Sequence, residues 1–131
     1  MIRVVAGIIV NDLGEILIAK KKQEKVLGGH WEFPGGKIEC GETLSEALVR
    51  ELREEMNIEV VIQSVVGTNI HHYEKVSIEI TALKVLIQSK DIILIDHDEI
   101  KWVRDVEMLE YNLAPADIPL AKKYLEMTYE K

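Results

Sequence analysis

Residues 35–58 read GGKIECGETLSEALVRELREEMNI, and this stretch decides how the rest of the chain is interpreted. It follows Pro34 and opens on two glycines, a combination that breaks regular structure and lets the backbone turn sharply. The residues from Thr43 to Met56 then favour a helix. Thr43 with Glu46 three residues later has the spacing of a capping box, which marks the start of that helix. The stretch therefore predicts a tight turn that leads into a helix.

The predicted helix carries three crowded carboxylates, at Glu51, Glu54 and Glu55. Spacings of three and four residues place them on adjoining parts of one face. Leu44 and Leu48 share the stripe of Glu51, so this carboxylate is expected at the margin of the buried face. One interpretation is a solvated acidic face. Because like charges four residues apart repel, and a carboxylate at a core margin needs a cation or donors, we favour a site for Mg²⁺ or Mn²⁺.

This segment resembles the signature of the Nudix hydrolase family, G-x5-E-x7-R-E-U-x-E-E-x-G-U, where U is aliphatic. The signature is matched by Gly36, Glu42, Arg50, Glu51, Leu52, Glu54, Glu55 and Ile58. Asn57 stands where the family has its last glycine. That glycine ends the helix in a left-handed conformation, and asparagine is the next most tolerant residue there. We therefore expect the geometry to survive at slight cost.

The resemblance implies an α/β fold, namely an α/β/α sandwich with a mixed sheet, a loop–helix–loop catalytic motif and a C-terminal helix. The expected unit is a single domain over residues 1–131. By analogy with the family, the three helix glutamates are expected to hold Mg²⁺, for which Mn²⁺ substitutes. The backbone carbonyl of Gly35 or Gly36 is expected to assist them.

Further catalytic candidates follow from the same resemblance. Glu42 and Arg50 are expected to brace the loop against the helix, as a plain salt bridge would also do. An acid from a late loop, or one of the helix glutamates, is expected to activate the attacking water. Asp96 is the candidate, because it lies six residues before Trp102, where related enzymes carry Glu. His97 beside it is interpreted either as a loop surface residue or as a participant.

The composition agrees with one globular domain, since 47% of the 131 residues are hydrophobic and 30% are charged. The net charge of −7 argues against polymeric nucleic acid and anionic membrane surfaces as partners. It permits a nucleoside triphosphate, because bound divalent cations reverse the local sign. A lone cysteine, Cys40, gives no internal disulfide, and no apolar run approaches the ~20 residues of a membrane helix. We therefore expect a cytoplasmic protein that is a monomer or a homodimer.

Apolar runs elsewhere indicate further elements. We expect strands at residues 2–10, 15–19, 59–66, 76–87, 92–95 and 101–103, with a turn at 11–14 that joins the first two as a hairpin. A short helix is expected to end near Leu109, and a final helix to start near Asp117.

Similarity to the Nudix family extends from about Val4 to Leu125 and points to its MutT-like branch. Residues 31–39, WEFPGGKIE, look like that branch's approach to the catalytic motif, and residues 113–119, LAPADIP, resemble its base-recognition segment. Members cleave nucleoside triphosphates to a monophosphate and pyrophosphate. The resemblance thus implies a Mg²⁺-dependent pyrophosphohydrolase that removes damaged or non-standard nucleotides.

Asp117 bears on which nucleotide is cleaved. The family's 8-oxo-dGTP enzyme carries Asn at the matching position, whose amide both accepts and donates, whereas an ionised Asp only accepts. An accepting carboxylate suits the exocyclic amine of cytosine, so (d)CTP and its modified forms are favoured over 8-oxo-dGTP. The alternative is that Asp117 only caps the final helix. Gly35, Gly36, Lys37 and Lys21 are candidates for substrate contacts, with a solvated strand end as the alternative for Lys21.

Two other classes of function stay open. A hydrolase of dinucleoside polyphosphates, at which Tyr73 hints, or of ADP-ribose would have the same fold. A non-catalytic module that senses nucleotides is the alternative from another class, but such modules usually lose acids that this helix retains. Trp31, Tyr73 and Trp102 are interpreted as packing residues, one of which is a candidate for stacking on the base.

Overall fold

A computed structural model describes residues 1–23, 28–89 and 91–129. In chain order the elements are β1 (Ile2–Val10), β2 (Ile16–Lys21), β3 (Trp31–Glu32), β4 (Gly35–Lys37), α1 (Leu44–Met56), β5 (Val60–His72), β6 (Ser77–Ile87), β7 (His97–Val103), the 3₁₀ helix η1 (Asp105–Glu110) and α2 (Ile118–Tyr129). Within these described ranges no helix combines the length and the apolar character needed to cross a membrane.

The strands form one mixed sheet in the order β3-β2-β1-β6-β5, with β4 also paired to β1 and β7 to β2. The pair β1–β6 is parallel, and the other pairs are antiparallel. The expected hairpin between β1 and β2 is present. Its turn is held by Asn11, whose Oδ1 accepts from the amides of Leu13 at 3.0 Å and Glu15 at 2.9 Å. Gly14 closes the turn with a φ of 75°, a conformation that glycine adopts without strain.

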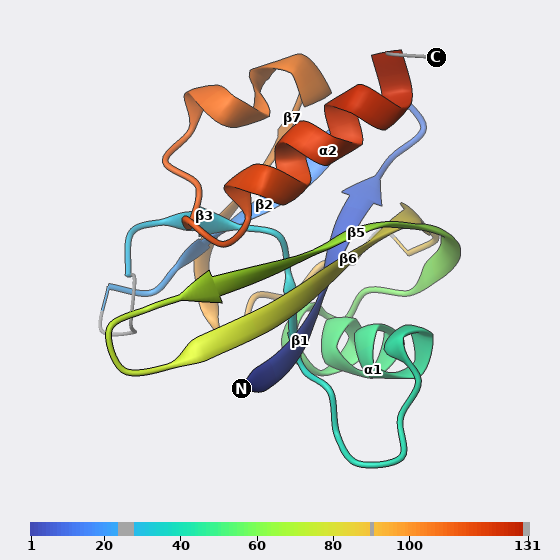
Figure 1. The fold of residues 1–131 in the computed structure, drawn as a ribbon. Helices are drawn as coiled ribbons and strands as arrows, with labels where there is room; N and C mark the ends of the chain where they lie inside the picture. The colour runs from blue at the N-terminus through green and yellow to red at the C-terminus, as the bar shows by residue number, and fades with distance from the viewer. Residues whose placement is uncertain (24–27, 90, 130–131) are drawn as a thin grey trace.

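The two long helices cover opposite faces of the sheet (Figure 1). Successive side chains of β1 alternate between these faces, as a period of two requires. Val5 and Ile9 belong to the hydrophobic cluster that includes Leu52 of α1. Ile8 belongs to the cluster that includes Leu120 of α2. The expected α/β/α sandwich with a mixed sheet and a C-terminal helix is confirmed.

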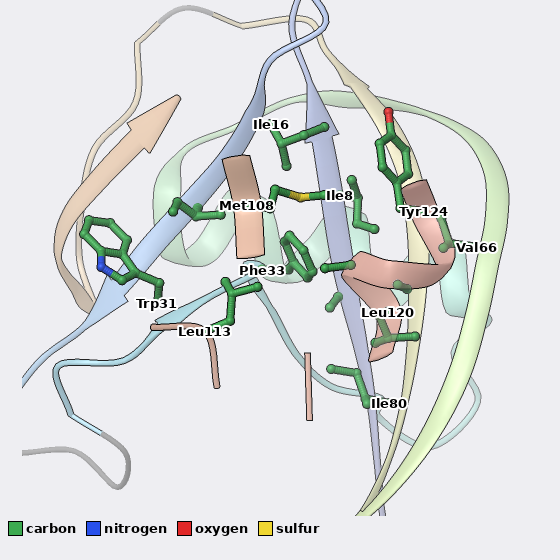
Figure 2. Close-up of a cluster of buried hydrophobic side chains, with 14 of the residues drawn as sticks. Ile8, Ile16, Trp31, Phe33, Val66, Ile80, Met108, Leu113, Leu120 and Tyr124 are labelled. Carbon is green, nitrogen blue, oxygen red and sulfur yellow. The ribbon is translucent and has the colours of Figure 1, made fainter. Parts of the chain in front are cut away.

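The hydrophobic cluster under α2 joins residues at and after β3 to the segment that leads to Asp117. Figure 2 shows Trp31 and Phe33 packed in it with Leu113 and Leu120. The backbone follows the same path, because the Trp31 amide donates to the Asn112 carbonyl at 2.9 Å and the Trp31 carbonyl accepts from the Ala114 amide at 2.8 Å. The segment that leads to Asp117 is therefore fixed against β3.

Three expectations about strands differ from the structure. Strand β7 begins at His97 rather than at residue 101, so His97 is a buried strand residue and not a loop surface residue. Residues 92–94 have no regular structure and Ile95 lies in a bend, so the expected strand at 92–95 is wrong. The backbone there serves α1 instead, since the amides of Ile93 and Ile95 donate to the carbonyls of Met56 at 3.0 Å and Glu55 at 3.2 Å. Strand β5 extends to His72 rather than ending near residue 66, because it pairs with β6 along its whole length.

Candidate active site

Helix α1 begins and ends as its sequence predicts. Thr43 Oγ1 accepts from the Glu46 amide at 3.1 Å, and Glu46 Oε1 accepts from the Thr43 amide at 2.9 Å, which completes the capping box. At the other end Asn57 takes the left-handed conformation, with φ 55° and ψ 37°. Its amide donates to the Arg53 carbonyl, and the next amide, of Ile58, donates to Leu52, so two terminal carbonyls are satisfied. This confirms the expected tolerance of asparagine at the C-cap.

A larger residue at Gly35 would clash with the backbone of β1, and one at Gly36 would require the carboxyl group of Glu51 to move. Gly35 and Gly36 form β4 opposite Ala6 and Val5 of β1. A Cβ on Gly35 would lie 2.0 Å from the Val5 carbonyl oxygen, and one on Gly36 would lie 2.3 Å from Cδ of Glu51. Because real Cβ atoms do not approach so closely, the absence of side chains lets this loop press against both β1 and α1.

Arg50 ties the loop to the helix. Its Nε and Nη2 bind both oxygens of Glu42, at 2.7 and 2.9 Å, in a bidentate pair. Nη2 also donates to the Lys37 carbonyl at 3.0 Å, and Nη1 to Glu51 Oε1 at 2.9 Å. The hydrogen bonds from Arg50 hold the pKa of Glu42 below its ordinary value. The structure thus brings the expected bracing pair together and adds a direct contact to the acidic cluster.

The helix glutamates divide into two groups. The side chain of Glu51 is 14% exposed, as expected for the margin of a core, whereas that of Glu54 is 60% exposed and lies 3.5 Å from Arg50 Nη1. Burial raises the pKa of Glu55 to about 8, with further contributions from the charges of Glu51, Asp96 and Glu32 and a hydrogen bond with Glu51. The charge of Asp96 thus acts on Glu55, although Asp96 does not line the cavity described below.

The donor set fits a hard divalent cation. Within the described ranges no three acidic, histidine or cysteine side chains converge in metal-binding geometry, and Glu54 lies 3.5 Å from Arg50 Nη1. The charge of Glu51 nevertheless contributes to the raised pKa of Glu55, so the two carboxyl groups lie near each other. A bound cation would offset this repulsion and would be held by oxygen ligands from both side chains. The all-oxygen character of the cluster suits Mg²⁺ or Mn²⁺.

A cavity of about 480 Å³ extends from Glu55 of α1 to Asp117, the residue before α2. Glu55, Gly36 and Lys37 line one side of it, and Tyr73 and Asp117 line another. Six of the sequence candidates thus line one space, namely Lys21, Gly35, Gly36, Lys37, Glu55 and Asp117. The other candidates do not line it, namely Glu42, Arg50, Glu51, Glu54 and Asp96.

The two tryptophans lie outside this cavity. Trp31 is buried in the cluster under α2, where its ring meets Tyr111 edge-on at 5.9 Å. Trp102 packs against the cluster on the α1 face. Of the three aromatic candidates, Tyr73 is the one that lines the cavity, and its hydroxyl accepts from the Ala116 amide at 3.3 Å.

Asp117 is buried, with 3% of its surface exposed. Its Oδ2 accepts from the Phe33 amide at 3.1 Å, so the carboxyl group turns toward β3. Burial and the charge of Glu32 raise its pKa to about 8, against the opposing effects of the Phe33 hydrogen bond and the Lys21 charge. Burial thus favours the neutral form of Asp117, whereas the sequence-based expectation was an ionised acceptor.

Sequence reasoning missed Glu32. This residue lines the cavity, and its carboxylate lies 2.8 Å from His97 Nε2 and 3.9 Å from Lys21 Nζ. The available signal was a charged residue placed between two core aromatics, Trp31 and Phe33. A two-residue strand is too short to show a period that would assign Glu32 to a face.

Comparison with known proteins agrees with this geometry. The pattern of the NUDIX domain matches residues 5–123. The chain belongs to the Nudix family. It is 39% identical over 127 residues to the CTP pyrophosphohydrolase of Escherichia coli (strain K12), which covers 97% of this chain and 93% of that protein. It is 39% identical over 72 residues to an 8-oxo-dGTP diphosphatase of Proteus vulgaris, covering 55% of this chain and 64% of that protein.

The fold of this Nudix protein is also found among solved structures. The solution structure of the Escherichia coli ORF135 protein has a TM-score of 0.87 and 36% identity, and covers 100% of this chain and 93% of that one. The chain is a Nudix hydrolase, an enzyme that acts on pyrophosphate bonds. Glu55 of its signature helix and the buried Asp117 both line one cavity.

Proposed function

We propose that this chain is a Mg²⁺-dependent nucleoside triphosphate pyrophosphohydrolase, which converts a (d)NTP and water to a (d)NMP and pyrophosphate. Its proposed substrates are (d)CTP, modified (d)CTP and 8-oxo-dGTP. Its proposed role is to remove damaged or non-standard nucleotides from the nucleotide pool. The observation that carries the proposal is the cavity that joins Glu55 of the signature helix to Asp117 before α2. A single domain over residues 1–131 and a cytoplasmic location are parts of the same proposal.

The phosphate side of the cavity is assigned as follows. Glu51, Glu54 and Glu55 would hold Mg²⁺ with the carbonyl of Gly36. The bound ion supplies charge neutralisation and orientation for the triphosphate. Asp96, whose charge acts on Glu55, would accept the proton of the attacking water.

Positively charged and bracing groups complete this side. Lys37 lines the cavity beside Gly36 and would contact the phosphates, while Lys21 lines it beside Glu32 and would be a further substrate contact. Arg50 holds Glu42 and the Lys37 carbonyl, so it keeps the loop at a fixed distance from α1 while the substrate changes charge. A rigid support of this kind contributes to rate because small displacements of reacting groups are costly.

The base side depends on the protonation of Asp117. With Oδ2 accepting from the Phe33 amide, a protonated carboxyl group can still donate through its other oxygen. It then offers a donor and an acceptor, as an amide does. Cytosine presents an amine beside a ring acceptor, and 8-oxoguanine presents a carbonyl beside a ring N–H, so both match this group. For this reason the two nucleotides are proposed together.

The decisive experiment is a hydrolysis panel with Mg²⁺ and identification of the phosphate products. The panel contains CTP, dCTP, 5-methyl-dCTP, 8-oxo-dGTP, ADP-ribose and diadenosine polyphosphates. Pyrophosphate released from a cytidine nucleotide or from 8-oxo-dGTP is the expected result. AMP released from ADP-ribose alone would replace the proposal with the ADP-ribose alternative. Nucleotide binding without turnover would favour the sensing module.

A further inference from the structure

His97 is a buried histidine to which the proposed reaction gives no task. Its side chain is 3% exposed, and it begins β7 directly after Asp96. Nε2 lies 2.8 Å from Glu32 Oε2. Among the described side chains, Nδ1 of His97 is the fully buried polar atom without a hydrogen-bond partner. A buried polar atom of this kind is unusual enough to require an explanation.

The contacts of Glu32 define which nitrogen of His97 carries the proton. The Lys21 ammonium stands 3.9 Å from Glu32 Oε1, so Glu32 is the carboxylate partner of an ion pair. A carboxylate only accepts, so Nε2 of His97 must donate to it. Nδ1 is then a lone pair in a neutral ring and leaves no buried N–H without an acceptor. The unpartnered atom is thus explained by a single tautomer.

The sheet is built to hold Glu32 from two sides. In the antiparallel pair β2–β7, Lys21 lies opposite His97, and the register shifts between Lys20 and Lys21. Such a bulge redirects side chains at the end of a strand. Both Lys21 and His97 consequently reach the carboxylate of Glu32, which lies on the neighbouring strand β3.

Glu32 lies in the cavity together with Glu55, on the proposed phosphate side, and Asp117, on the proposed base side. It lines the cavity, and its charge raises the pKa of Asp117 on one side and of Glu55 on the other. A carboxylate that lines the cavity can accept a hydrogen bond from an N–H donor of a bound ligand through its remaining lone pairs. Its direction depends on His97, because the hydrogen bond from His97 is shorter than the contact with Lys21.

We propose that His97 is a positioning residue which, as the neutral Nε2–H tautomer, aims the Glu32 carboxylate at N–H donors on the base of a nucleotide bound in the cavity. This rests on the proposed function, since it assumes a nucleotide ligand. His97 acts on binding through Glu32, while the chemical step belongs to the acidic cluster. It is therefore distinct from a histidine that merely fills the core.

The test compares His97→Leu with His97→Gln, whose side-chain amide keeps a donor near the place of Nε2. Leucine is expected to raise KM for the best nucleotide of the panel, and Kd for its monophosphate product, roughly tenfold with kcat changed less than twofold. Glutamine is expected to restore most of the affinity. Deoxyribose 5′-triphosphate, which lacks a base, should show no change in KM.

Two further measurements isolate the path through Glu32. In a Glu32→Gln background, His97→Leu should add little to KM, because coupled residues are not additive. Thr81→Val is the matched control, since it removes another buried hydrogen bond, that to Thr68, away from the cavity lining. It should lower Tm and leave KM unchanged. Long-range ¹H–¹⁵N spectra of the unmodified protein should show the Nε2–H tautomer.

Several outcomes would overturn the assignment. A fall in kcat at unchanged KM would mean that His97 acts on Asp96. Additive effects of Glu32→Gln and His97→Leu, or an Nδ1–H tautomer, would refute the path through Glu32. Lack of hydrolysis by the unmodified protein would refute the proposed function alone, because the Kd values still report on His97. Lack of any nucleotide binding would refute both.

Discussion

Gly36 has a hydrogen atom where other residues carry Cβ, and this lets the loop at β4 lie close to α1. In the variant Gly36→Ala, the new Cβ would need the space that Cδ of Glu51 occupies, 2.3 Å away. We expect a loss of about 1–3 kcal/mol in the free energy of unfolding, typical of overpacking, together with a larger loss of activity because Glu51 is displaced. Thermal unfolding and kcat measure the two effects. Gly67→Ala is the control, as its Cβ would meet Lys123 at an ordinary 3.5 Å. Equal behaviour of the two variants would contradict the close packing.

Glu54 differs from its two neighbours because it is exposed and free to swing from Arg50. The proposed function assigns it to the metal all the same, so Glu54→Gln should reduce kcat by roughly 100-fold or more while Tm stays constant. Because Glu54 is exposed, the substitution removes little packing, so a loss of kcat would report on catalysis rather than on stability. Glu126→Gln on α2, also exposed, is the matched control for removal of one surface charge. Undiminished turnover by Glu54→Gln would exclude Glu54 from the metal site.

At the scale of elements, the C-terminus of α1 shows how a departure from the family pattern is accommodated. Asn57 supplies the left-handed conformation, and its side-chain amide also donates to the Asp91 carbonyl at 3.1 Å. We expect Asn57→Ala to cost about 1 kcal/mol, because alanine tolerates positive φ poorly. Asn57→Gly should be near neutral, since it relieves the backbone but loses the contact with Asp91. Denaturant unfolding distinguishes these cases, and a more stable alanine than glycine variant would contradict the C-cap argument.

The elements that the sequence predicts well are those whose signals are local. The capping box of Thr43, the turn at Asn11 and the apolar runs of β1 and β6 depend on neighbouring residues, and the structure confirms them. The apolar run at 92–95 wrongly predicted a strand. In the structure, the amides of Ile93 and Ile95 donate hydrogen bonds to the last carbonyls of α1. That role depends on where the helix ends in space, which a local pattern does not contain.

The same distinction separates the residues of the candidate site. The pairing of Glu42 with Arg50 follows from a signature of fixed spacing, and the structure brings the two side chains together. The contact between Glu32 and His97 joins residues 65 positions apart and depends on the pairing of β2 with both β3 and β7. The protonation of Asp117 likewise depends on burial and on Glu32, and neither is visible in the sequence around it.

For the whole molecule, the cavity concentrates acidic groups in a chain whose net charge is already −7. Glu55 and Asp117 both have pKa values raised to about 8, and burial is the largest cause in each case. Both groups are thus kept protonated by the fold. Their unfolded forms would ionise near pH 4, since their ordinary values are 4.5 and 3.8. Between about pH 4 and pH 8 these two groups hold more protons in the native protein than in the unfolded chain.

Linkage then fixes how the stability of the protein depends on pH. Because the native state holds the extra protons, the free energy of unfolding must fall as the pH rises from about 4 through 8.

Asp117→Asn removes one of the two groups without removing the acceptor for the Phe33 amide. The variant should therefore match the unmodified protein near pH 4 and exceed it in Tm at pH 8, with each kcal/mol regained worth about 4 °C. Asp98→Asn, at an exposed position, should leave the pH profile unchanged. Mg²⁺ should reduce the slope that remains in Asp117→Asn, because a cation bound by Glu55 replaces its proton. Parallel profiles for Asp117→Asn and the unmodified protein would mean that Asp117 is ionised in the native state, and the cavity would then offer the base an acceptor alone.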